Sequence, residues 1–266
     1  MKDYSAEREV ELKLPMPDTH EDVLRIVRAA LPDGWSIVRR PSTISLDTYF
    51  DTPERSLHAT STTFRVRRWK LPFSPKGFNA NWKFPPVAHG YSEREELKTK
   101  LDADEIMQYR HNAIPGAAAR AAYEWIAMHC QGPGDGPAGS LRPAVHVASQ
   151  RQTYGVTPSG GPEWYVFLVL FDACTTFRID DGDAERFFRT GSIGWESPRR
   201  VATFAEAEIE LNTVELPAEL SDAAWAVFRL IVEHAHEAGG SHILNKYSQA
   251  LAVLGDERSG HSYAEA

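Results

Sequence analysis

Five short stretches of this chain place acidic or basic side chains at every second position. A repeat of two residues is the period of a β-strand, so the charged side chains of each stretch share one face and apolar side chains share the other. On one isolated strand, a charged face usually just contacts solvent. Recurrence over five strands is what indicates chemistry. The charged positions are Glu9, Glu11 and Lys13; Arg65 and Arg67; Lys83; Arg94, Glu96 and Lys98; and Glu206, Glu208 and Glu210.

Two of these faces carry only charges of one sign: Glu206, Glu208 and Glu210 on one, and Arg65 and Arg67 on another. Like charges side by side on a strand face cost a few tenths to about 1 kcal/mol per pair, so each group calls for a compensating ion. Carboxylates are hard ligands that favour Mg²⁺ or Mn²⁺. Arginine and lysine together favour phosphate. If the strands close into a barrel, these faces converge on one lumen, which about eight strands make wide enough for a small ligand. A metal–polyphosphate complex would then satisfy both sets of charges, which are otherwise costly to bury.

The elements that must position these residues are mostly strands. Apolar alternation and turn residues predict eight strands and several helices. The strands are expected at 9–14, 42–50, 60–70, 78–84, 91–101, 143–154, 164–180 and 203–211. Helices are expected after Asp18-Thr19, from Asp102, and at 115–130, 217–238 and 242–254, with an insertion loop at 181–200.

The composition is that of a globular protein and limits the class of partner. The chain has 266 residues, of which 42% are hydrophobic and 25% charged, which excludes wholesale disorder and a coiled-coil rod. The net charge of −8 argues against binding a nucleic-acid duplex, but it leaves room for a local basic pocket. No apolar run reaches the roughly 20 residues of a membrane helix, the first residues are charged, and Cys130 and Cys174 form no CxxC pair. We therefore expect a cytoplasmic protein with reduced thiols.

The order of these motifs resembles the CYTH family, the triphosphate tunnel metalloenzymes. The resemblance runs from Glu9 to Tyr247, and it departs from the family where Lys98 stands in place of a second glutamate and where 102–130 and 181–200 are extended. The motifs that resemble the family are Glu9-x-Glu11-x-Lys13, Tyr49-Phe50-Asp51-Thr52, Phe64-Arg65-Val66-Arg67, Trp82-Lys83, Arg94-x-Glu96, Arg151 followed by Tyr154, Asp172, Glu208-x-Glu210 and Lys246-Tyr247.

The resemblance implies an α+β fold, a closed eight-stranded antiparallel β-barrel or tunnel with flanking helices. We expect residues 1–254 to form this one domain, and the polar residues from Gly255 onward predict a disordered tail at 255–266. It implies a triphosphatase in which water attacks the terminal phosphoryl group, with Lys13 and Glu11 as catalytic residues and either Lys13 or a carboxylate activating the water. The implied ligands of Mg²⁺ or Mn²⁺ are Glu9, Glu11, Asp172, Glu206, Glu208 and Glu210. The implied phosphate-binding residues are Lys13, Arg65, Arg67, Lys83, Arg94, Arg151 and Lys246.

Two other functions fit the same residues. A class IV adenylyl cyclase would form cyclic AMP and pyrophosphate, although Ala6-Glu7-Arg8 replaces the His-Phe that this subgroup tends to carry before its first motif. A polyphosphate- or nucleotide-binding barrel without turnover would need the bases but not the acids at both ends of the chain. The sequence leaves open whether the substrate is inorganic triphosphate, thiamine triphosphate or a nucleotide, and it leaves the oligomeric state open.

Overall fold

The computed structural model describes residues 5–15, 19–70, 77–88, 91–101, 141–158, 165–179, 202–212, 216, 218–238 and 244–255. The helices expected within 102–130, the insertion at 181–200, Cys130 and residues 256–266 of the expected tail lie outside these ranges. The division into one domain of residues 1–254 and a tail stays a prediction.

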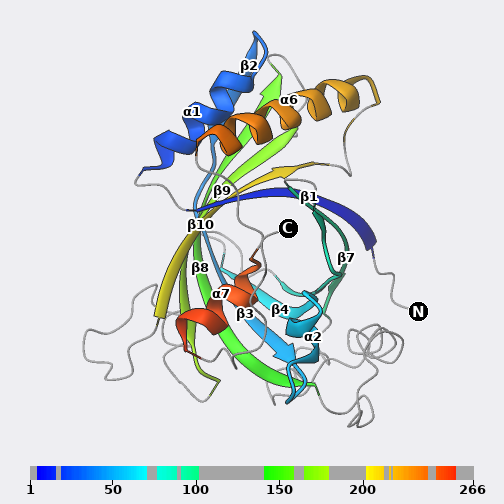
Figure 1. The fold of residues 1–266 in the computed structure, drawn as a ribbon, viewed down its shortest axis with the longest axis vertical. Coiled ribbons are helices and arrows are strands. Elements are labelled where there is room, and N and C mark those ends of the chain that lie inside the picture. The colour runs from blue at the N-terminus through cyan, green and yellow to red at the C-terminus, as the bar shows by residue number, and fades with distance from the viewer. Residues whose placement is uncertain are drawn as a thin grey trace.

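Eight antiparallel strands form a closed barrel, which appears in Figure 1 as a ring. Each strand pairs with its neighbour in the order β1, β10, β9, β8, β3, β4, β5, β7, and β7 pairs with β1 to close the ring. This confirms the expected α+β tunnel fold. The strands are β1 (Ser5–Pro15), β3 (Thr43–Asp51), β4 (Thr63–Lys70), β5 (Phe78–Lys83), β7 (Ser92–Lys100), β8 (Arg142–Pro158), β9 (Phe167–Phe177) and β10 (Ala202–Leu211).

The register of the strands brings the charged faces together. Glu11 lies opposite Glu210 and Lys13 opposite Glu208 where β1 pairs with β10. Glu9 lies opposite Arg94 where β1 pairs with β7. Directly opposed residues point to the same side of a sheet, so the alternation read in each strand becomes one charged inner face.

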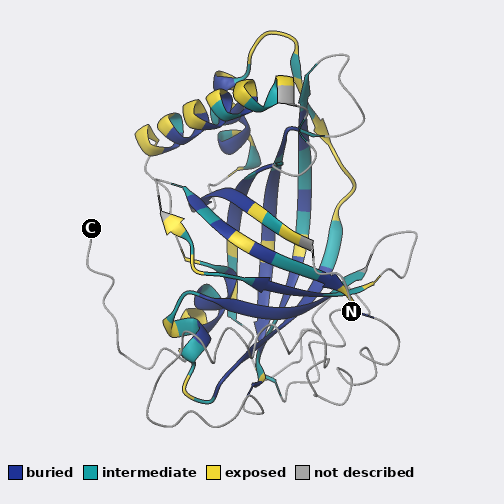
Figure 2. Ribbon diagram, turned by 90° about the vertical axis from the view of Figure 1, so that its right-hand side faces the viewer, coloured by how far each residue is buried: buried dark blue, intermediate teal, exposed yellow. Residues whose placement is uncertain are grey.

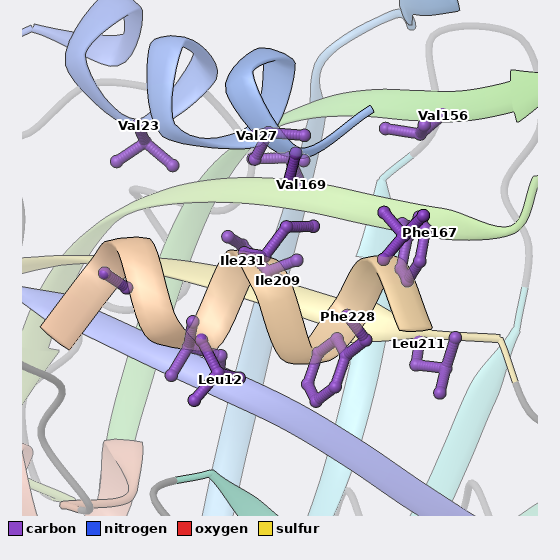
Figure 3. Close-up of a cluster of buried hydrophobic side chains, with 14 of the residues drawn as sticks. Leu12, Val23, Val27, Val156, Phe167, Val169, Ile209, Leu211, Phe228 and Ile231 are labelled. Atoms are coloured by element: carbon purple, nitrogen blue, oxygen red, sulfur yellow. The ribbon is translucent and has the colours of Figure 1, made fainter. Parts of the chain in front are cut away.

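The outer face of β1, β9 and β10 is apolar and is covered by two helices. Helix α1 (His20–Ala30) buries Val23 and Val27, and α6 (Ala218–Glu237) buries Phe228 and Ile231. Figure 3 shows these side chains facing Leu12, Val169, Ile209 and Leu211 of the barrel strands. In Figure 2 the barrel strands are largely buried, whereas α6 exposes one side. The outer core therefore holds the barrel in shape while its inner face stays polar.

Several short elements differ from the expectations. Strand β2 (Trp35–Arg39), which pairs with β8, and β6 (Val87–Ala88), which pairs with β7, were not expected. Both lie outside the ring, and β2 has no fully buried residue. Helix α2 (Ser56–Ala59) precedes β4, so that strand begins at Thr63 rather than at residue 60.

Helix α7 (Lys246–Val253) begins later than the expected residue 242. The side chain of its N-cap residue, Asn245, accepts the Ser248 N–H at 2.9 Å. Its residues Tyr247, Ala250 and Leu251 pack with Val145 and Val147 of β8 in an apolar cluster, and Figure 1 shows α7 in front of β8. Cys174 of β9 belongs to this cluster as a free, buried thiol.

In the part of the chain that the structure describes, no helix is both long enough and apolar enough to cross a membrane.

Candidate active site

A cavity of about 300 Å³ lies inside the barrel, at the lower end of the range for ligand pockets. Its lining contains eight basic and five acidic side chains, an excess of three positive charges in a protein whose net charge is −8. Such a surplus favours an anionic ligand. The charged lining residues are Lys13, Arg65, Arg67, Lys83, Arg94, Lys98, Arg151, Lys246, Glu9, Glu11, Glu96, Glu208 and Glu210.

The charges of the inner face divide into two groups, which we call the acidic wall and the basic wall. The acidic wall consists of Glu9, Glu11 and Lys13 of β1, Asp172 of β9, Glu206, Glu208 and Glu210 of β10, and Lys246 of α7. The basic wall consists of Asp47 of β3, Arg65 and Arg67 of β4, Lys83 of β5, Arg94, Glu96 and Lys98 of β7, and Arg151 of β8.

In the basic wall, one buried carboxylate orients two arginines. Arg67 donates from Nε and Nη2 to the two oxygens of Asp47, both at 2.6 Å, and Arg65 donates from Nη1 at 3.2 Å. Burial alone would raise the pKa of Asp47, but the two guanidinium groups outweigh it and the pKa is lowered. One carboxylate compensates only one of two positive charges. The pair is thus fixed in position and still attracts an anion.

Strand β7 adds a second set of pairs to the basic wall. Lys98 contacts Glu96 at 2.9 Å, and Asn81 donates to Glu96 at 2.8 Å. Burial raises the pKa of Glu96, yet Lys83, Lys98 and Arg65 bring it down to about 2. Glu96 is therefore held as an anion that balances its basic neighbours.

The two walls meet at ion pairs. Lys83 contacts Glu9 at 2.5 Å, while Arg94 contacts Glu9 at 3.3 Å and donates a short hydrogen bond to Glu11. These contacts lie where β7 pairs with β1. Because Glu9 and Glu11 face bases on one side and carboxylates on the other, they form the boundary between the walls.

The acidic wall gathers its carboxylates around two lysines. The ammonium of Lys13 contacts Glu208 closely and lies 3.7 Å from Glu11 and 3.8 Å from Glu206. Burial would lower the pKa of Lys13, but Glu11, Glu206 and Glu208 outweigh it and raise that pKa. Lys13 therefore keeps its proton and acts as a fixed positive charge.

The second lysine, Lys246, enters from the first turn of α7. Its ammonium lies 2.8 Å from Asp172 and 3.2 Å from Glu208, and it contacts Glu206 closely. One oxygen from each of these three carboxylates lies within 4.8 Å of the others, a spacing that can hold a metal ion. Arg151 also contacts Asp172 at 2.5 Å and Glu208 at 3.0 Å. Positive side chains, Lys246 and Arg151, therefore already contact the three carboxylates.

Glu210 is the carboxylate of the acidic wall that has no partner in the described part of the chain. It lines the cavity opposite Glu11, and the structure shows no hydrogen bond or ion pair to its carboxylate within those residues. Burial and the nearby charge of Glu9 raise the pKa of Glu210 to about 7, and they outweigh the opposite effect of Lys83, Lys98 and Arg151, which form no ion pair with it. A cation bound beside it would favour its charged form. Glu210, Glu9 and Glu11 thus offer oxygen donors that fit Mg²⁺ or Mn²⁺.

The family model of the CYTH domain matches residues 7–236. The chain belongs to the CYTH family. CYTH enzymes act on triphosphates and use divalent metals.

One solved structure shares the fold of this CYTH protein at low sequence identity, and two further ones are similar over most of their length. A candidate adenylate cyclase from Bacillus halodurans is 15% identical with a TM-score of 0.52, over 92% of this chain and 97% of its own. A Pyrococcus horikoshii protein is 15% identical with a TM-score of 0.47, over 92% of this chain and 98% of its own. A candidate adenylyl cyclase from Hippeastrum, described as having a dominant triphosphatase activity, is 16% identical with a TM-score of 0.46, over 92% of this chain and 95% of its own. No curated protein matches.

The structure brings most of the residues named from the sequence to this CYTH cavity. All seven expected phosphate-binding residues line it, as do four of the six expected metal ligands, namely Glu9, Glu11, Glu208 and Glu210. Asp172 and Glu206 are not among the described residues that line it. They are almost fully buried and contact Lys246.

Arg151 and Asp172 lie in strands where apolar residues do not alternate cleanly. In the structure they are direct cross-strand partners in a regular β8–β9 register. The alternation is obscured because Leu170 and Leu168 lie two and four residues before Asp172 and therefore share the inner face of β9 with it. Where β8 pairs with β3, the register shifts between Tyr49 and Phe50 of β3.

Two functional features of the CYTH barrel were not recognised from the sequence. Asp47 orients Arg65 and Arg67; its only signal was the alternation of Ser45, Asp47 and Tyr49 with apolar neighbours. The second feature is the role of Asp51, which accepts the backbone N–H groups of Thr52, Leu57 and His58 and, at 3.0 Å, the hydroxyl of Tyr247.

Tyr247 also stacks on Tyr49, with 5.2 Å between the ring centres. The Tyr49–Thr52 motif therefore docks α7 onto the barrel. Because Lys246 precedes Tyr247 in the same helix, this docking places the Lys246 ammonium among its carboxylates.

Proposed function

We propose that this CYTH protein is a metal-dependent triphosphatase that hydrolyses the terminal phosphoryl group of a triphosphate inside the barrel. The observation that carries the proposal is one cavity whose basic wall has a surplus of positive charge and whose acidic wall contains an unpartnered carboxylate, Glu210. A triphosphate with a divalent ion supplies both missing charges. An anion-binding barrel without turnover would have no use for the acidic wall.

The phosphate groups are bound by the bases that line the cavity. Arg65 and Arg67 are oriented by Asp47, so little side-chain freedom is lost when they engage phosphate oxygens. Lys83, Arg94 and Arg151 extend this surface toward the acidic wall. In phosphoryl transfer, such positioning and charge neutralisation supply most of the catalysis.

The divalent ion would be held by the six carboxylates of the acidic wall. Glu9, Glu11 and Glu210 face the cavity, and Asp172, Glu206 and Glu208 have ligand oxygens spaced closely enough for a metal. When bound, Mg²⁺ or Mn²⁺ would neutralise charge on the phosphate oxygens. All of these ligands are hard oxygen donors, which agrees with that choice of metals.

In the proposed reaction, the oxygen of a water molecule attacks the terminal phosphorus. The bond from that phosphorus to the bridging oxygen breaks, and the remaining phosphate chain leaves with the bonding electrons. Lys13 is held protonated by Glu11, Glu206 and Glu208, so we assign it to hydrogen bonding with the phosphoryl oxygens. We assign the acceptance of the water proton to a carboxylate, and Glu11, which contacts Lys13, is the candidate.

A substrate panel tests this function. We expect orthophosphate release from at least one of inorganic triphosphate, thiamine triphosphate and nucleoside triphosphates with Mg²⁺ or Mn²⁺, and none with EDTA. The variant Glu11→Gln should lose about 100-fold in turnover while remaining folded, whereas Arg25→Gln on the exposed side of α1 should retain it. Cyclic AMP in place of orthophosphate would indicate a cyclase, and tight binding without product would indicate a binding protein. Either result would contradict the proposal.

A further inference from the structure

A second cavity, of about 600 Å³, adjoins the charged one. Three residues, Trp69, Asn79 and Arg151, line both cavities. Trp69 follows Arg67 by two residues and therefore lies on the same inner face of β4. A ligand whose phosphates lie against Arg67 and Arg151 can thus extend directly into this second space.

The wall of the second cavity is mainly apolar. Leu168 and Leu170 lie on the inner face of β9, and Trp69 lies on that of β4, with the guanidinium carbon of Arg67 at 4.8 Å from its ring centre. Phe78 and Leu101 complete the apolar lining. When a ligand removes apolar surface of this kind from water, the free energy of binding becomes more favourable by about 25 cal/mol per Å². Inorganic triphosphate has no group that could use it.

The polar groups of this cavity further restrict the ligand. Its charged lining residues are Lys100 and Arg151, and its described lining includes no carboxylate. Among the described residues, a cationic ring would therefore meet two positive charges and no negative one. Thr43, Asn79 and Thr153 also line it, and within the described part of the chain the structure shows no hydrogen bond to their side chains. They offer donors and acceptors to a polar, uncharged ring or to sugar hydroxyls.

We propose that the substrate is a nucleoside triphosphate whose base lies in the second cavity, against Trp69, Leu168 and Leu170, while its phosphates lie in the charged cavity. The inference rests on the proposed function and names its substrate class. A nucleobase is flat, uncharged and rich in hydrogen-bonding groups, and so it matches both the apolar wall and the amide and hydroxyl side chains that line the cavity. Thiamine triphosphate carries a positively charged ring and does not match.

The test separates binding from turnover. Calorimetry in EDTA measures the affinity of the full-length chain for ATP, GTP, inorganic triphosphate and thiamine triphosphate, and orthophosphate release with Mn²⁺ measures KM and kcat for each. Two variants change residues that line the second cavity and not the charged one: Leu168→Ala removes apolar surface, and Thr153→Trp fills the space. Val38→Ala, on the exposed part of β2 outside the barrel, is the matched control.

We expect the wild type to bind a nucleoside triphosphate at least tenfold more tightly than inorganic triphosphate. Leu168→Ala should weaken nucleotide binding and raise its KM about fivefold. Thr153→Trp should remove the preference for nucleotides, and both variants should leave the affinity and KM for inorganic triphosphate within twofold. A variant that merely unfolds would lose all ligands together, and circular dichroism would show it.

Other outcomes overturn the inference. Equal affinity for inorganic and nucleoside triphosphates, equal effects of the variants on both, or a preference for thiamine triphosphate would each contradict it while leaving the triphosphatase proposal intact. Failure of every triphosphate to bind or react would instead contradict the proposed function itself. The two failures are therefore distinguishable.

Discussion

The acidic and basic walls of the barrel have opposite composition but are built in different ways. The basic wall has six bases and two carboxylates, and the acidic wall has six carboxylates and two lysines. In the basic wall the carboxylate of Asp47 is fully buried behind the arginines that it orients. In the acidic wall the lysines themselves line the cavity, and the carboxylates lie on several sides of them.

This difference shows what each wall still lacks. Asp47 neutralises only one of the two positive charges of Arg65 and Arg67. The basic wall therefore keeps a surplus positive charge at the cavity, which an anion would neutralise. The lysines of the acidic wall compensate Asp172, Glu206 and Glu208, but Glu210 stays unpartnered within the described residues. That wall therefore lacks a cation. The following changes test the comparison, beginning with the largest expected effect.

Replacing Lys13 should damage the acidic wall most. Lys13→Met keeps the length of the side chain but leaves Glu11, Glu206 and Glu208 without its buried charge. Breaking a buried ion pair on one side costs about 3 kcal/mol in the free energy of unfolding, and loss of a fixed charge at the phosphates should lower turnover at least 100-fold. Denaturant unfolding and orthophosphate release measure both. Turnover within fivefold of the wild type would show that the acidic wall does not need this charge.

Replacing Asp47 should affect substrate binding more than turnover. In Asp47→Asn the bidentate contact to Arg67 is lost and both arginines become less ordered. We expect about a tenfold rise in KM for the triphosphate, equivalent to about 1.4 kcal/mol, with a smaller change in kcat. Steady-state kinetics separate the two constants. A fall in kcat with unchanged KM would mean that this wall acts on the transition state rather than as a binding surface.

Asp47→Asn should also change how the stability of the fold depends on pH. The pKa of Asp47 in the folded protein lies below its ordinary value of 3.8, because Arg67 and Arg65 outweigh the effect of burial. A carboxyl group with a lowered pKa stabilises the fold above its unfolded pKa, and this stability is lost as the pH falls through the folded pKa. Wild-type stability should therefore decline below about pH 4, and the decline should be shallower in Asp47→Asn. Equal acid unfolding curves would contradict the pairing.

Neutralising Glu210 should stabilise the metal-free protein, whereas the other changes should destabilise it. Glu210→Gln removes a carboxylate that lacks a cationic partner in the described structure and lies near Glu9. We expect the metal-free protein to gain about 1 kcal/mol in the free energy of unfolding, and the rise in Tm on adding Mn²⁺ to shrink. Thermal unfolding with EDTA and with Mn²⁺ measures this. An unchanged response to Mn²⁺ would show that the ion binds elsewhere.

The smallest effect is expected at the docking of α7. Tyr247→Phe keeps the stack on Tyr49 but removes the hydroxyl that donates to Asp51 at 3.0 Å. Asp51 still accepts three backbone N–H groups, so the cost should be about 1 kcal/mol. Turnover should fall only a few-fold, through small displacement of Lys246. A loss of turnover as large as that of Lys13→Met would mean that the docking of α7 positions more of the acidic wall than its contacts indicate.

Much of the barrel could be predicted because its signal is local. Alternation at period two marks a strand and its charged face within six residues, as in Glu9–Leu14, and an apolar stripe marks α1 in the same way. Strand β2 was missed because it has only five residues, so that Trp35 and Ile37 give just two alternating apolar positions, and both are only partly buried. Asp47 was missed because a single acid between hydroxyl and apolar residues looks ordinary until its partners are known.

The sequence by itself determined which side chains share a face on each strand, and so it identified the bases and acids that enter the barrel. Only the tertiary structure decided which charges neutralise each other. Asp172 and Glu206 were equal candidates to Glu210 in the sequence, yet they contact the ammonium of Lys246, which comes from a helix beyond β10, while Glu210 has no such partner among the described residues. The reason is physical: alternation fixes the direction of a side chain, whereas pairing depends on strand register and on the docking of α7, which bring together residues far apart in the chain.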